Sequence, residues 1–345
     1  MKKCKGCGIE LQNVDNKKIG FVPDLEQDYC QRCFRLSHYG DITNLNNKNI
    51  TNKGIMDIYS QYAKDTFVVI VDAFEALVIN QDEFFDLFDK NRFILIINKT
   101  DLLPKNISDD KVDTIYEDVI NRFAGTHHNL ISCILTHKKD SSFNDVFYET
   151  LNSLKCKRLV FAGRANVGKS SLINKLINNN ELTTSLYPGT TLRAVEIKHE
   201  GYTFIDTPGY IDENNVSSYL PVEIFKDVMI EDTIKPQVFQ LYEKQTYFYE
   251  DLLRIDVEPK DKASVVFYLN NNLLVHRTKT FNVENYLKNK RFKYSLKPKS
   301  ANEFTVKKKS SFYIKGLGFF TVNSDCLIRI HVFDKIKIYK SEVNL

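Results

Sequence analysis

One short segment constrains the fold of this chain more than any other. Residues Gly163 to Ser170 read GRANVGKS, which matches the pattern G-x4-G-K-S, and they directly follow the strand-like segment 158–162. A strand, a glycine-containing loop and a helix start in this order predict a phosphate-binding loop, because glycine lets backbone N–H groups approach phosphate oxygens closely. We expect Lys169 to reach the β and γ phosphates and Ser170 to bind Mg²⁺.

Further apolar runs predict the sheet that carries this loop. Residues 67–72 and 93–98 are short, rich in β-branched side chains, and followed by polar or turn residues. Such runs are typical of buried parallel strands. Helical patterns occur between and after them, at 82–90, 109–123 and 143–154. The alternation predicts an α/β fold, with a doubly wound open sheet covered by helices on both faces.

Two more motifs complete a site for a nucleoside triphosphate. Asp206-Thr-Pro-Gly209 follows the apolar strand 202–205, so Asp206 is placed to hold Mg²⁺ and the Gly209 amide to bond the γ-phosphate. Pro188-Gly-Thr-Thr191 lies between this motif and the phosphate-binding loop. Thr191 is the preferred second Mg²⁺ ligand, with Thr190 as the alternative. Both threonines are also compatible with a solvent-facing turn.

The base is selected by a fourth motif. Asn98-Lys99-Thr-Asp101 stands at the end of strand 93–98. A carboxylate at position 101 can accept from guanine N1–H and N2–H₂ together, which adenine does not offer. The Asn98 carboxamide can bond the base edge, and the stem of Lys99 can cover the ring. Ser132, after the apolar residues 129–131, is expected to be a weaker base-contacting turn.

Together these motifs resemble those of translation-factor-class GTPases. Their order differs, because residues 98–101 and 132 precede the phosphate-binding loop instead of following residues 206–209. Such an order indicates a circular permutation, which is physically allowed because domain termini often lie close together. With the leading segment CKGCG…CQRCFRLSHYGD, the chain is similar over about residues 1–212 to the YqeH-type circularly permuted GTPases. Where that family has Ser-Ala-Lys, this chain has Ser132-Cys-Ile.

The resemblance implies bound GTP or GDP with Mg²⁺, GTP hydrolysis, and a role in assembling the small ribosomal subunit. The implied nucleotide-contacting residues are Gly163, Arg164, Ala165, Asn166, Val167, Gly168, Lys169, Ser170 and Ser171 of the loop, with Asn98, Lys99, Asp101, Ser132, Asp206 and Gly209.

Four of the seven cysteines form two pairs, Cys4-x2-Cys7 and Cys30-x2-Cys33. Two such knuckles can complete a closed tetrahedral Cys4 shell, which is typical of structural Zn²⁺. His38 is expected outside this shell. Residues 1–50 would form the zinc-binding module, since so short a segment needs the metal for folding free energy. The alternative is four unpaired buried cysteines.

Two residues, Tyr210 and Asn166, lead to expectations about the rate of GTP hydrolysis. Tyr210 follows Gly209 where Ras-like enzymes place a water-orienting glutamine. Tyrosine does not combine the donor and acceptor of a carboxamide, so slow intrinsic hydrolysis is expected within domain 51–212. Asn166 stands where related GTPases hold K⁺ beside the phosphates, and a bound K⁺ would offset transition-state charge. The equal alternative is that Asn166 only shapes the loop.

The last third, 213–345, is expected to be a mixed α/β or β-rich domain. Residues 213–260 look helical or mixed, and 265–269, 273–276 and 328–333 look like strands. Between Arg277 and Lys315 there are twelve Lys and Arg but two acidic residues, with aromatic residues interspersed. This combination favours ribosomal RNA as the partner; the alternative is a β domain with a core of aromatics and a solvated basic face. These aromatic residues include Phe281, Tyr286, Phe292, Tyr294, Phe304 and Phe312.

No apolar run approaches the ~20 residues that span a bilayer, and the first residues lack a secretion signal. We therefore expect a cytoplasmic monomer without a membrane partner. The leading interpretation is a GTP-hydrolysing switch that binds ribosomal RNA or a precursor subunit. An RNA-binding scaffold with a structural nucleotide is the alternative, and a small-molecule kinase is a third.

Overall fold

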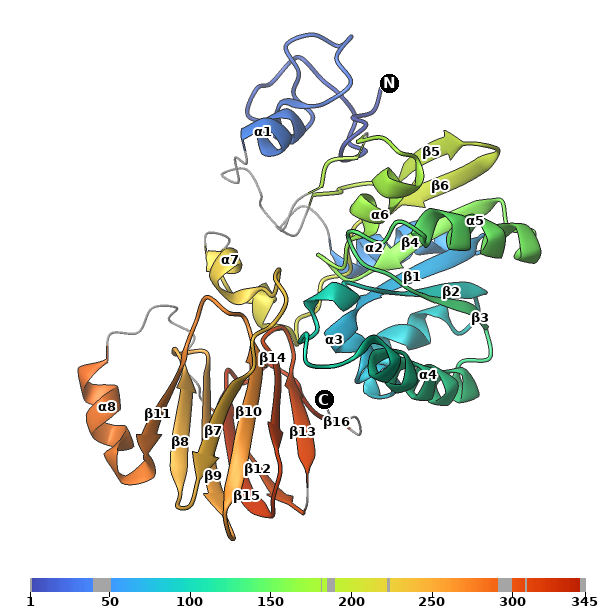
Figure 1. Ribbon diagram of the computed structural model, residues 1–345. Helices are drawn as coiled ribbons and strands as arrows, with labels where there is room; N and C mark the ends of the chain where they lie inside the picture. Colours follow the sequence, from blue (N-terminus) through green and yellow to red (C-terminus); the bar gives the residue numbers. More distant parts are fainter. Residues whose placement is uncertain are drawn as a thin grey trace. The chain divides into compact units, whose positions relative to one another are not determined.

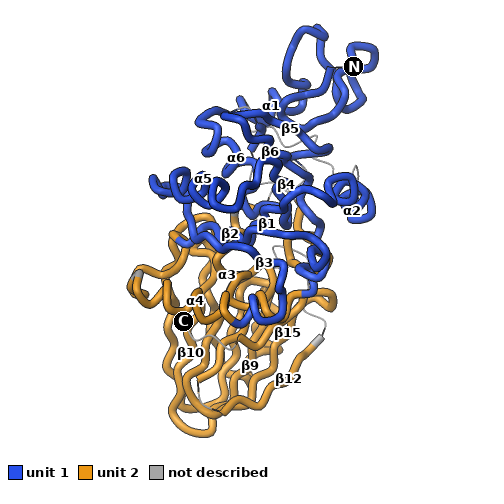
Figure 2. Tube along the Cα trace, turned by 90° about the vertical axis from the view of Figure 1, so that its right-hand side faces the viewer, with its two compact units in different colours: residues 1–72, 83–100, 122–211 blue, residues 73–82, 101–121, 212–345 orange. Residues whose placement is uncertain are grey.

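The structure is a computed structural model that describes residues 2–39, 51–180, 182–184, 190–221, 224–290, 300–307 and 309–341. Pro188, Phe292, Tyr294 and Lys308 lie outside the described residues, as does the basic stretch 291–299. The chain divides into two compact units (Figure 2). Unit 1 comprises 1–72, 83–100 and 122–211, and unit 2 comprises 73–82, 101–121 and 212–345.

Unit 1 is built on a six-stranded sheet with the order β3-β2-β1-β4-β6-β5 (Figure 1). All neighbouring strands are parallel except β5, which runs antiparallel to β6. The strands are β1 (Thr66–Asp72), β2 (Phe93–Asn98), β3 (Leu130–Leu135), β4 (Arg158–Gly163), β5 (Val195–His199) and β6 (Tyr202–Asp206).

The register of this sheet places two motifs at one edge. Strand β1 lies between β2 and β4, with Asp72 opposite Asn98 and Ile70 opposite Gly163. Strand β2 therefore ends in the Asn98 motif where β4 ends in the phosphate-binding loop. In open α/β sheets, ligands bind outside these carboxyl ends, where the strand order reverses. The predicted parallel α/β sheet is confirmed.

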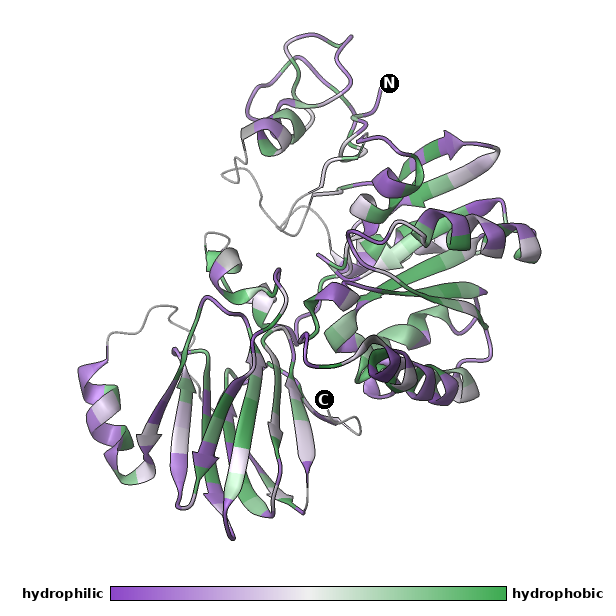
Figure 3. Cartoon of the chain, in the orientation of Figure 1, coloured by the Kyte–Doolittle hydropathy of each residue, from purple (hydrophilic) through white to green (hydrophobic). Residues whose placement is uncertain are grey.

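Helices cover both faces of the sheet, because alternate strand residues point to opposite sides. On one face, Phe143, Phe147 and Leu151 recur every four residues along α5 (Phe143–Leu154) and are at most 1% exposed. They form one apolar cluster with Leu172 of α6 (Lys169–Leu176) and with residues of β1, β2 and β4. Figure 3 shows the hydrophobic residues concentrated along these strands.

On the other face, Phe67 of β1 packs against Tyr59 of α2 (Asn52–Gln61) and against Phe88, with ring centroids 5.6 and 5.4 Å apart. Phe88 ends the 3-10 helix η3 (Glu83–Phe88). The expected helix 82–90 is thus a short 3-10 turn, because this tighter winding buries Phe84, Phe85 and Phe88 together.

The remaining helices are α1 (Gln31–Tyr39), α3 (Ala73–Ala76), α4 (Asp109–Thr126), α7 (Phe225–Val228) and α8 (Val283–Asn289). No helix of the described residues is both long enough and apolar enough to cross a membrane.

Most of unit 2 is a β-sandwich of two five-stranded antiparallel sheets, with the orders β16-β13-β14-β10-β7 and β11-β8-β9-β15-β12. Aromatic side chains bridge the sheets: Tyr247 lies 5.3 Å from Phe267, and Phe304 lies 5.0 Å from Phe312. The strands are β7 (Gln237–Leu241), β8 (Gln245–Tyr249), β9 (Leu253–Pro259), β10 (Ala263–Leu269), β11 (Val275–Lys279), β12 (Ser300–Val306), β13 (Ser310–Ile314), β14 (Gly318–Val322), β15 (Cys326–Val332) and β16 (Ile338–Ser341).

The described part of 213–260 is mixed, which is one of the two expected alternatives: it holds the 3-10 helix η5 (Val216–Ser218), the short helix α7 and then strands β7, β8 and β9. The expected set of exposed aromatic side chains needs correction. Phe312 is fully buried, and Tyr286 stacks on His276 at 4.3 Å. Among the described aromatics of the basic stretch, Phe281 is the one that is largely exposed, at 85%.

Candidate functional site

The phosphate-binding loop connects β4 to α6 through a backbone that needs glycine. Gly163 and Gly168 have φ of 147° and 101°, and a Cβ at Gly163 would lie 2.5 Å from the carbonyl oxygen of Ile70. Asn166 also has a positive φ of 66°, a conformation that asparagine tolerates better than most residues. The loop therefore follows the path expected from its sequence, with α6 beginning at Lys169.

Lys169 points into this loop. Its Nζ donates hydrogen bonds to the carbonyl oxygens of Arg164, at 2.8 Å, and Gly163, at 3.2 Å. The side chain is buried, and this burial lowers the pKa of Lys169 to about 8, although the nearby Asp206 carboxylate acts in the opposite direction. An ammonium group that is stripped of water in this way interacts strongly with any phosphate that enters.

Three oxygen atoms from three separate segments meet beside the loop. The hydroxyl groups of Ser170 and Thr191 each donate to Oδ2 of Asp206 at 2.8 Å, and they lie 3.5 Å from each other. Asp206 is fully buried, which raises the pKa of its carboxyl group. Its Oδ1 accepts no hydrogen bond from the described residues. Hydroxyl and carboxylate oxygens are the ligand types that Mg²⁺ prefers. The Thr190 side chain is not part of this hydrogen-bonded group.

The Asn98 motif touches the same loop. The Asn98 carboxamide donates to the carbonyl oxygen of Val167 at 2.8 Å, and a Cβ on Gly168 would lie 2.5 Å from its Nδ2. Lys99 has a positive φ of 65°, and Asp101 follows as an exposed residue of the 3-10 helix η4 (Thr100–Leu102). Two motifs that are far apart in the chain are thus brought together, in the reversed order that the sequence predicts.

Ser132 does not form the expected turn. It lies inside β3, opposite Ile94, and the strand continues to Leu135. The residues at the carboxyl end are Thr136, His137 and Lys138, which the sequence analysis missed. The main-chain N–H and the hydroxyl group of Thr100 both contact the Thr136 carbonyl oxygen, at 3.3 and 3.2 Å. The sequence signal for this position is Thr136, the first polar residue after the apolar end of β3.

Gly209 and Tyr210 lie directly on the phosphate-binding loop. The N–H of Tyr210 donates to Gly163 O at 3.0 Å, and the N–H of Ala165 donates to Tyr210 O at 3.2 Å. A Cβ on Gly209 would meet the Ala165 backbone at 2.7 Å, so only glycine allows this approach. The Arg164 guanidinium lies 4.5 Å from the Phe84 ring centroid, and Phe84 lies 5.2 Å from the Tyr210 ring.

The cysteine pairs converge as predicted. The Sγ atoms of Cys4, Cys7, Cys30 and Cys33 all lie within 4.8 Å of one another, and all four residues are buried. Tetrahedral Zn²⁺ with bonds of about 2.3 Å requires sulfur atoms about 3.8 Å apart; the pair Cys7–Cys30 lies at 3.9 Å. His38 lies outside this group and packs against Phe34, with ring centroids 4.4 Å apart. The four thiolates fit a structural Zn²⁺.

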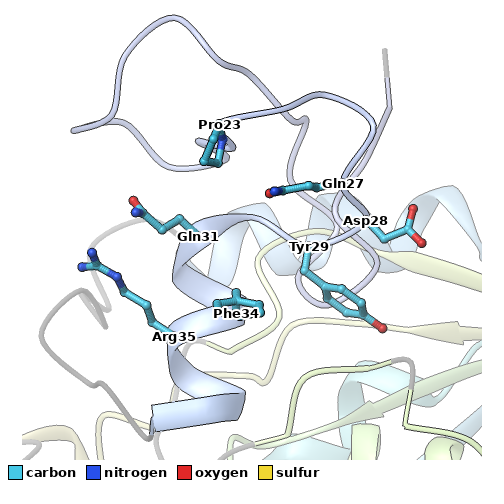
Figure 4. Close-up of a pocket in the computed structure, with 7 residues that line it drawn as sticks. All are labelled: Pro23, Gln27, Asp28, Tyr29, Gln31, Phe34 and Arg35. Atoms are coloured by element: carbon cyan, nitrogen blue, oxygen red, sulfur yellow. The ribbon is translucent and has the colours of Figure 1, made fainter.

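The cysteine module, residues 2–39, has a pocket of about 480 Å³ (Figure 4). Phe34, which is 46% exposed, and Tyr29 supply aromatic surface. The Asp28 carboxylate in the lining is paired with Lys5 at 2.8 Å and Lys2 at 3.0 Å. The full lining is Pro23, Gln27, Asp28, Tyr29, Gln31, Phe34 and Arg35.

Comparison with known proteins agrees with this geometry. A sequence model of the family described as "50S ribosome-binding GTPase" matches residues 158–270. The protein named Uncharacterized protein YqeH of Bacillus subtilis (strain 168) is 29% identical over 344 residues, which cover 93% of this chain and 92% of that protein. GTPase Der of Agathobacter rectalis is 30% identical over 169 residues, covering 44% of this chain and 36% of Der.

NO-associated protein 1, chloroplastic/mitochondrial, of Arabidopsis thaliana is 24% identical over 330 residues, covering 80% of this chain and 58% of that protein. The likeness to the Bacillus protein thus extends over the cysteine module, the sheet and the β-sandwich together. The phosphate-binding loop follows the fourth strand of the chain, and the Asn98 motif follows the second. This chain is thus a circularly permuted GTPase, which binds guanine nucleotide with Mg²⁺ and hydrolyses GTP, and it is similar over 93% of its length to the Bacillus protein named YqeH.

Proposed function

We propose that this GTPase is a nucleotide-dependent switch that binds ribosomal RNA of a precursor small subunit. The convergence of Ser170, Thr191 and Asp206 on one point carries the proposal, because these residues come from the loop and from both segments that would sense the γ-phosphate. Segments of this kind order around a triphosphate and relax after hydrolysis. The affinity for the partner then depends on which nucleotide is bound.

In this proposal each motif has one role in nucleotide binding. Lys169 and the loop amides from Gly163 to Ser171 hold the phosphates, and Ser170, Thr191 and Asp206 hold Mg²⁺. The Gly209 amide bonds the γ-phosphate. Asn98, Lys99 and Asp101 contact guanine, and Thr136–Lys138 replaces Ser132 as the base-contacting turn, since it is the segment bonded to Thr100.

Hydrolysis requires charge neutralisation and an oriented water, with little covalent work by the protein. Lys169 and the loop amides supply the first, together with Mg²⁺. Tyr210 has no carboxamide to orient water, and its backbone is bonded to the loop, so we propose slow intrinsic turnover. The Asn166 carboxamide is proposed to help hold K⁺ beside the phosphates.

RNA binding is proposed for the two regions outside the nucleotide site. Residues 1–50 would act as a zinc module, 51–212 as the GTPase domain and 213–345 as the RNA-binding domain. The basic stretch 277–315 supplies charge for phosphates, and exposed Phe281, with Lys279 5.9 Å from its ring, supplies a stacking surface. In the cysteine module, Phe34 and Arg35 both line the pocket and supply an aromatic ring and a cation there.

Co-sedimentation tests the switch directly. The full chain is mixed with purified small or large ribosomal subunits, with GDP or with a non-hydrolysable GTP analogue, and the pelleted fraction is measured. We expect small-subunit binding that differs at least tenfold between the two nucleotides. Equal binding with both nucleotides would instead support a scaffold with a structural nucleotide. Binding to the large subunit alone would assign the partner named by the matching family description.

Two further measurements refine the partner. Phe281→Ala and Phe34→Ala should each weaken binding to single-stranded ribosomal RNA while leaving GTP turnover unchanged, because neither residue lies in the nucleotide site. Val14→Ala is the matched control, since Val14 is 90% exposed on the cysteine module and lies outside the pocket lining. Sedimentation equilibrium of the free protein checks the expected monomer.

A further inference from the structure

The cysteine module contacts the same stretch of chain that carries Thr191. The main-chain N–H groups of Leu192 and Arg193 both donate to the carbonyl oxygen of Cys7, at 2.9 and 3.0 Å. Cys7 is itself one of the four clustered cysteines. A single peptide group of the first knuckle therefore binds the chain immediately after Thr191.

A second contact lies immediately before Thr191. Arg32 stands on α1, between Cys30 and Cys33, and its Nη1 donates to the carbonyl oxygen of Thr190 at 3.2 Å. The two cysteine knuckles thus hold the chain on either side of one residue. Hydrogen bonds from a guanidinium are stronger than those between neutral groups.

Apolar packing and backbone shape reinforce these hydrogen bonds. Leu192 is 6% exposed and belongs to the same apolar cluster as the four cysteines, Leu11 and Val22. Gly8 has a positive φ of 74°, and a Cβ at this position would lie 2.8 Å from the carbonyl oxygen of Arg193. The knuckle approaches the segment this closely because position 8 is glycine.

Thr191 itself faces the nucleotide site, where its hydroxyl group donates to Asp206. We infer that Arg32 and the carbonyl group of Cys7 are positioning groups for Thr191, so that zinc binding at the four cysteines and Mg²⁺-dependent GTP binding are energetically coupled. The inference rests on the proposed role of Thr191 as a Mg²⁺ ligand. No residue of the module needs to touch GTP for this coupling to operate.

The coupling follows from the entropy of ordering a chain segment. A loop that must be fixed before it can bind a ligand loses conformational entropy on binding. The module already fixes residues 190–193, so less entropy is lost when Mg²⁺ and GTP bind. The cysteine module has too few residues to form an apolar core of its own, so we expect it to need bound metal to stay folded. Coupling of this kind is reciprocal, so the GTP complex must also retain zinc more tightly.

Arg32 provides the first test, because it is not a metal ligand. In Arg32→Ala, we expect the affinity for a non-hydrolysable GTP analogue with Mg²⁺ to fall about tenfold, with kcat falling similarly and the GDP affinity changing less than twofold. Arg32→Lys should restore most of the loss, since an ammonium group also donates to a carbonyl oxygen. Lys17→Ala, an exposed cation of the same module, is the control. Zinc content of one per chain confirms that each variant is folded. An Arg32→Ala variant with wild-type affinities would overturn the inference.

A double-mutant cycle separates this inference from the proposed function. If Thr191→Ala alone changes neither the Mg²⁺ requirement nor turnover, the proposed role of Thr191 fails. If Thr191→Ala has a large effect, Arg32→Ala should add almost nothing in that background, because it acts through Thr191. Fully multiplicative losses would show that Arg32 acts elsewhere, and would overturn the inference while leaving the proposed function intact.

Hydrogen exchange provides a measurement that is independent of activity. The full chain is compared before and after zinc removal by a chelator, with zinc content measured in each sample. We expect the Leu192 and Arg193 amides to exchange at least tenfold faster without zinc, and affinity for the GTP analogue to fall more than affinity for GDP. Unchanged exchange and unchanged affinities after complete zinc removal would overturn the coupling.

Discussion

The carboxamide of Asn98 lies 2.8 Å from the carbonyl oxygen of Val167, although the two residues are 69 positions apart in the chain. Strand β1 explains this contact, since it pairs with β2 on one side and with β4 on the other. The end of β2 is thereby held one strand away from the start of the phosphate-binding loop. The sheet depends on which strands are neighbours and not on their order in the chain, so the permutation preserves the site.

Replacement of Asp101 by asparagine should change the base preference. The variant loses the carboxylate that is proposed to accept from two guanine donors, and its amide can donate to the second carbonyl group of xanthine. We expect affinity for GTP to fall by about 100-fold or more and affinity for XTP to rise. Competition binding with labelled GDP checks this. Asp113→Asn, an exposed residue of α4, should bind GTP normally. Normal GTP affinity in Asp101→Asn would remove this residue from the base site.

Turnover should depend on the monovalent cation. A K⁺ held by Asn166 would neutralise charge that develops in the transition state, so we expect about tenfold faster steady-state hydrolysis in KCl than in NaCl. Asn166→Gly is an informative variant, because glycine keeps the positive φ of 66° but removes the carboxamide. It should retain GTP binding and lose the stimulation. Identical rates in both salts for the wild type would leave Asn166 with a purely backbone role.

Lys315 should be essential for the stability of unit 2. Its Nζ lies 2.7 Å from Oδ2 of Asp212 and 3.6 Å from Oδ2 of Asp82; the side chains of Lys315 and Asp82 are buried, and that of Asp212 is 9% exposed. Lys315→Met would leave two carboxylates in a site from which water is excluded, which costs about 3–5 kcal/mol. Urea unfolding followed by circular dichroism measures the loss. The exposed Lys260→Met should change the free energy of unfolding by less than about 0.5 kcal/mol, and an equally small loss at Lys315 would contradict the prediction.

Asp256 should make the β-sandwich sensitive to acid. Burial acts to raise the pKa of Asp256, but hydrogen bonds from His331, Arg254 and Thr246 outweigh it and hold this pKa well below its usual value. The stabilisation is therefore present above the unfolded pKa of about 4 and is lost as the pH falls toward the folded pKa. Asp256→Asn should cost about 2–3 kcal/mol at pH 7.

The free energies of unfolding of the wild type and of Asp256→Asn, measured at pH 7 and at pH 3, test this direction of the pH dependence. The difference from the wild type should shrink at the lower pH, because the wild-type protein then begins to lose the same interaction. Asp261→Asn lies in an exposed turn and should show no difference at either pH. A difference that grows at low pH would contradict the assignment.

The parts of this fold that the sequence predicts are those encoded locally. Residues 163–170 specify a strand end, a loop and a helix start within one short segment, and Cys4 to Cys33 specify a metal-sized cluster by spacing alone. Ser132 was misplaced because the end of β3 is fixed by its pairing with β2, where Leu135 still opposes Ile97. That register depends on a neighbouring strand, and no local pattern reports it.

The same distinction explains the other misses. The strands between 237 and 259 are buried by a partner sheet that forms from residues up to 341, so their own periodicity is weak. The contact of Cys7 with Leu192 joins residues at opposite ends of unit 1 in sequence, and it becomes visible only in three dimensions.

The permuted order also determines which part of the chain follows the last GTPase motif, residues 206–209. Only two residues separate Gly209 from Asp212, whose carboxylate is ion-paired with Lys315 in the β-sandwich. In an unpermuted enzyme, that glycine would be followed by the remaining strands of its own sheet. Here the chain leaves unit 1 three peptide bonds after Gly209, and Asp212, the residue at the end of those bonds, forms its ion pair within unit 2.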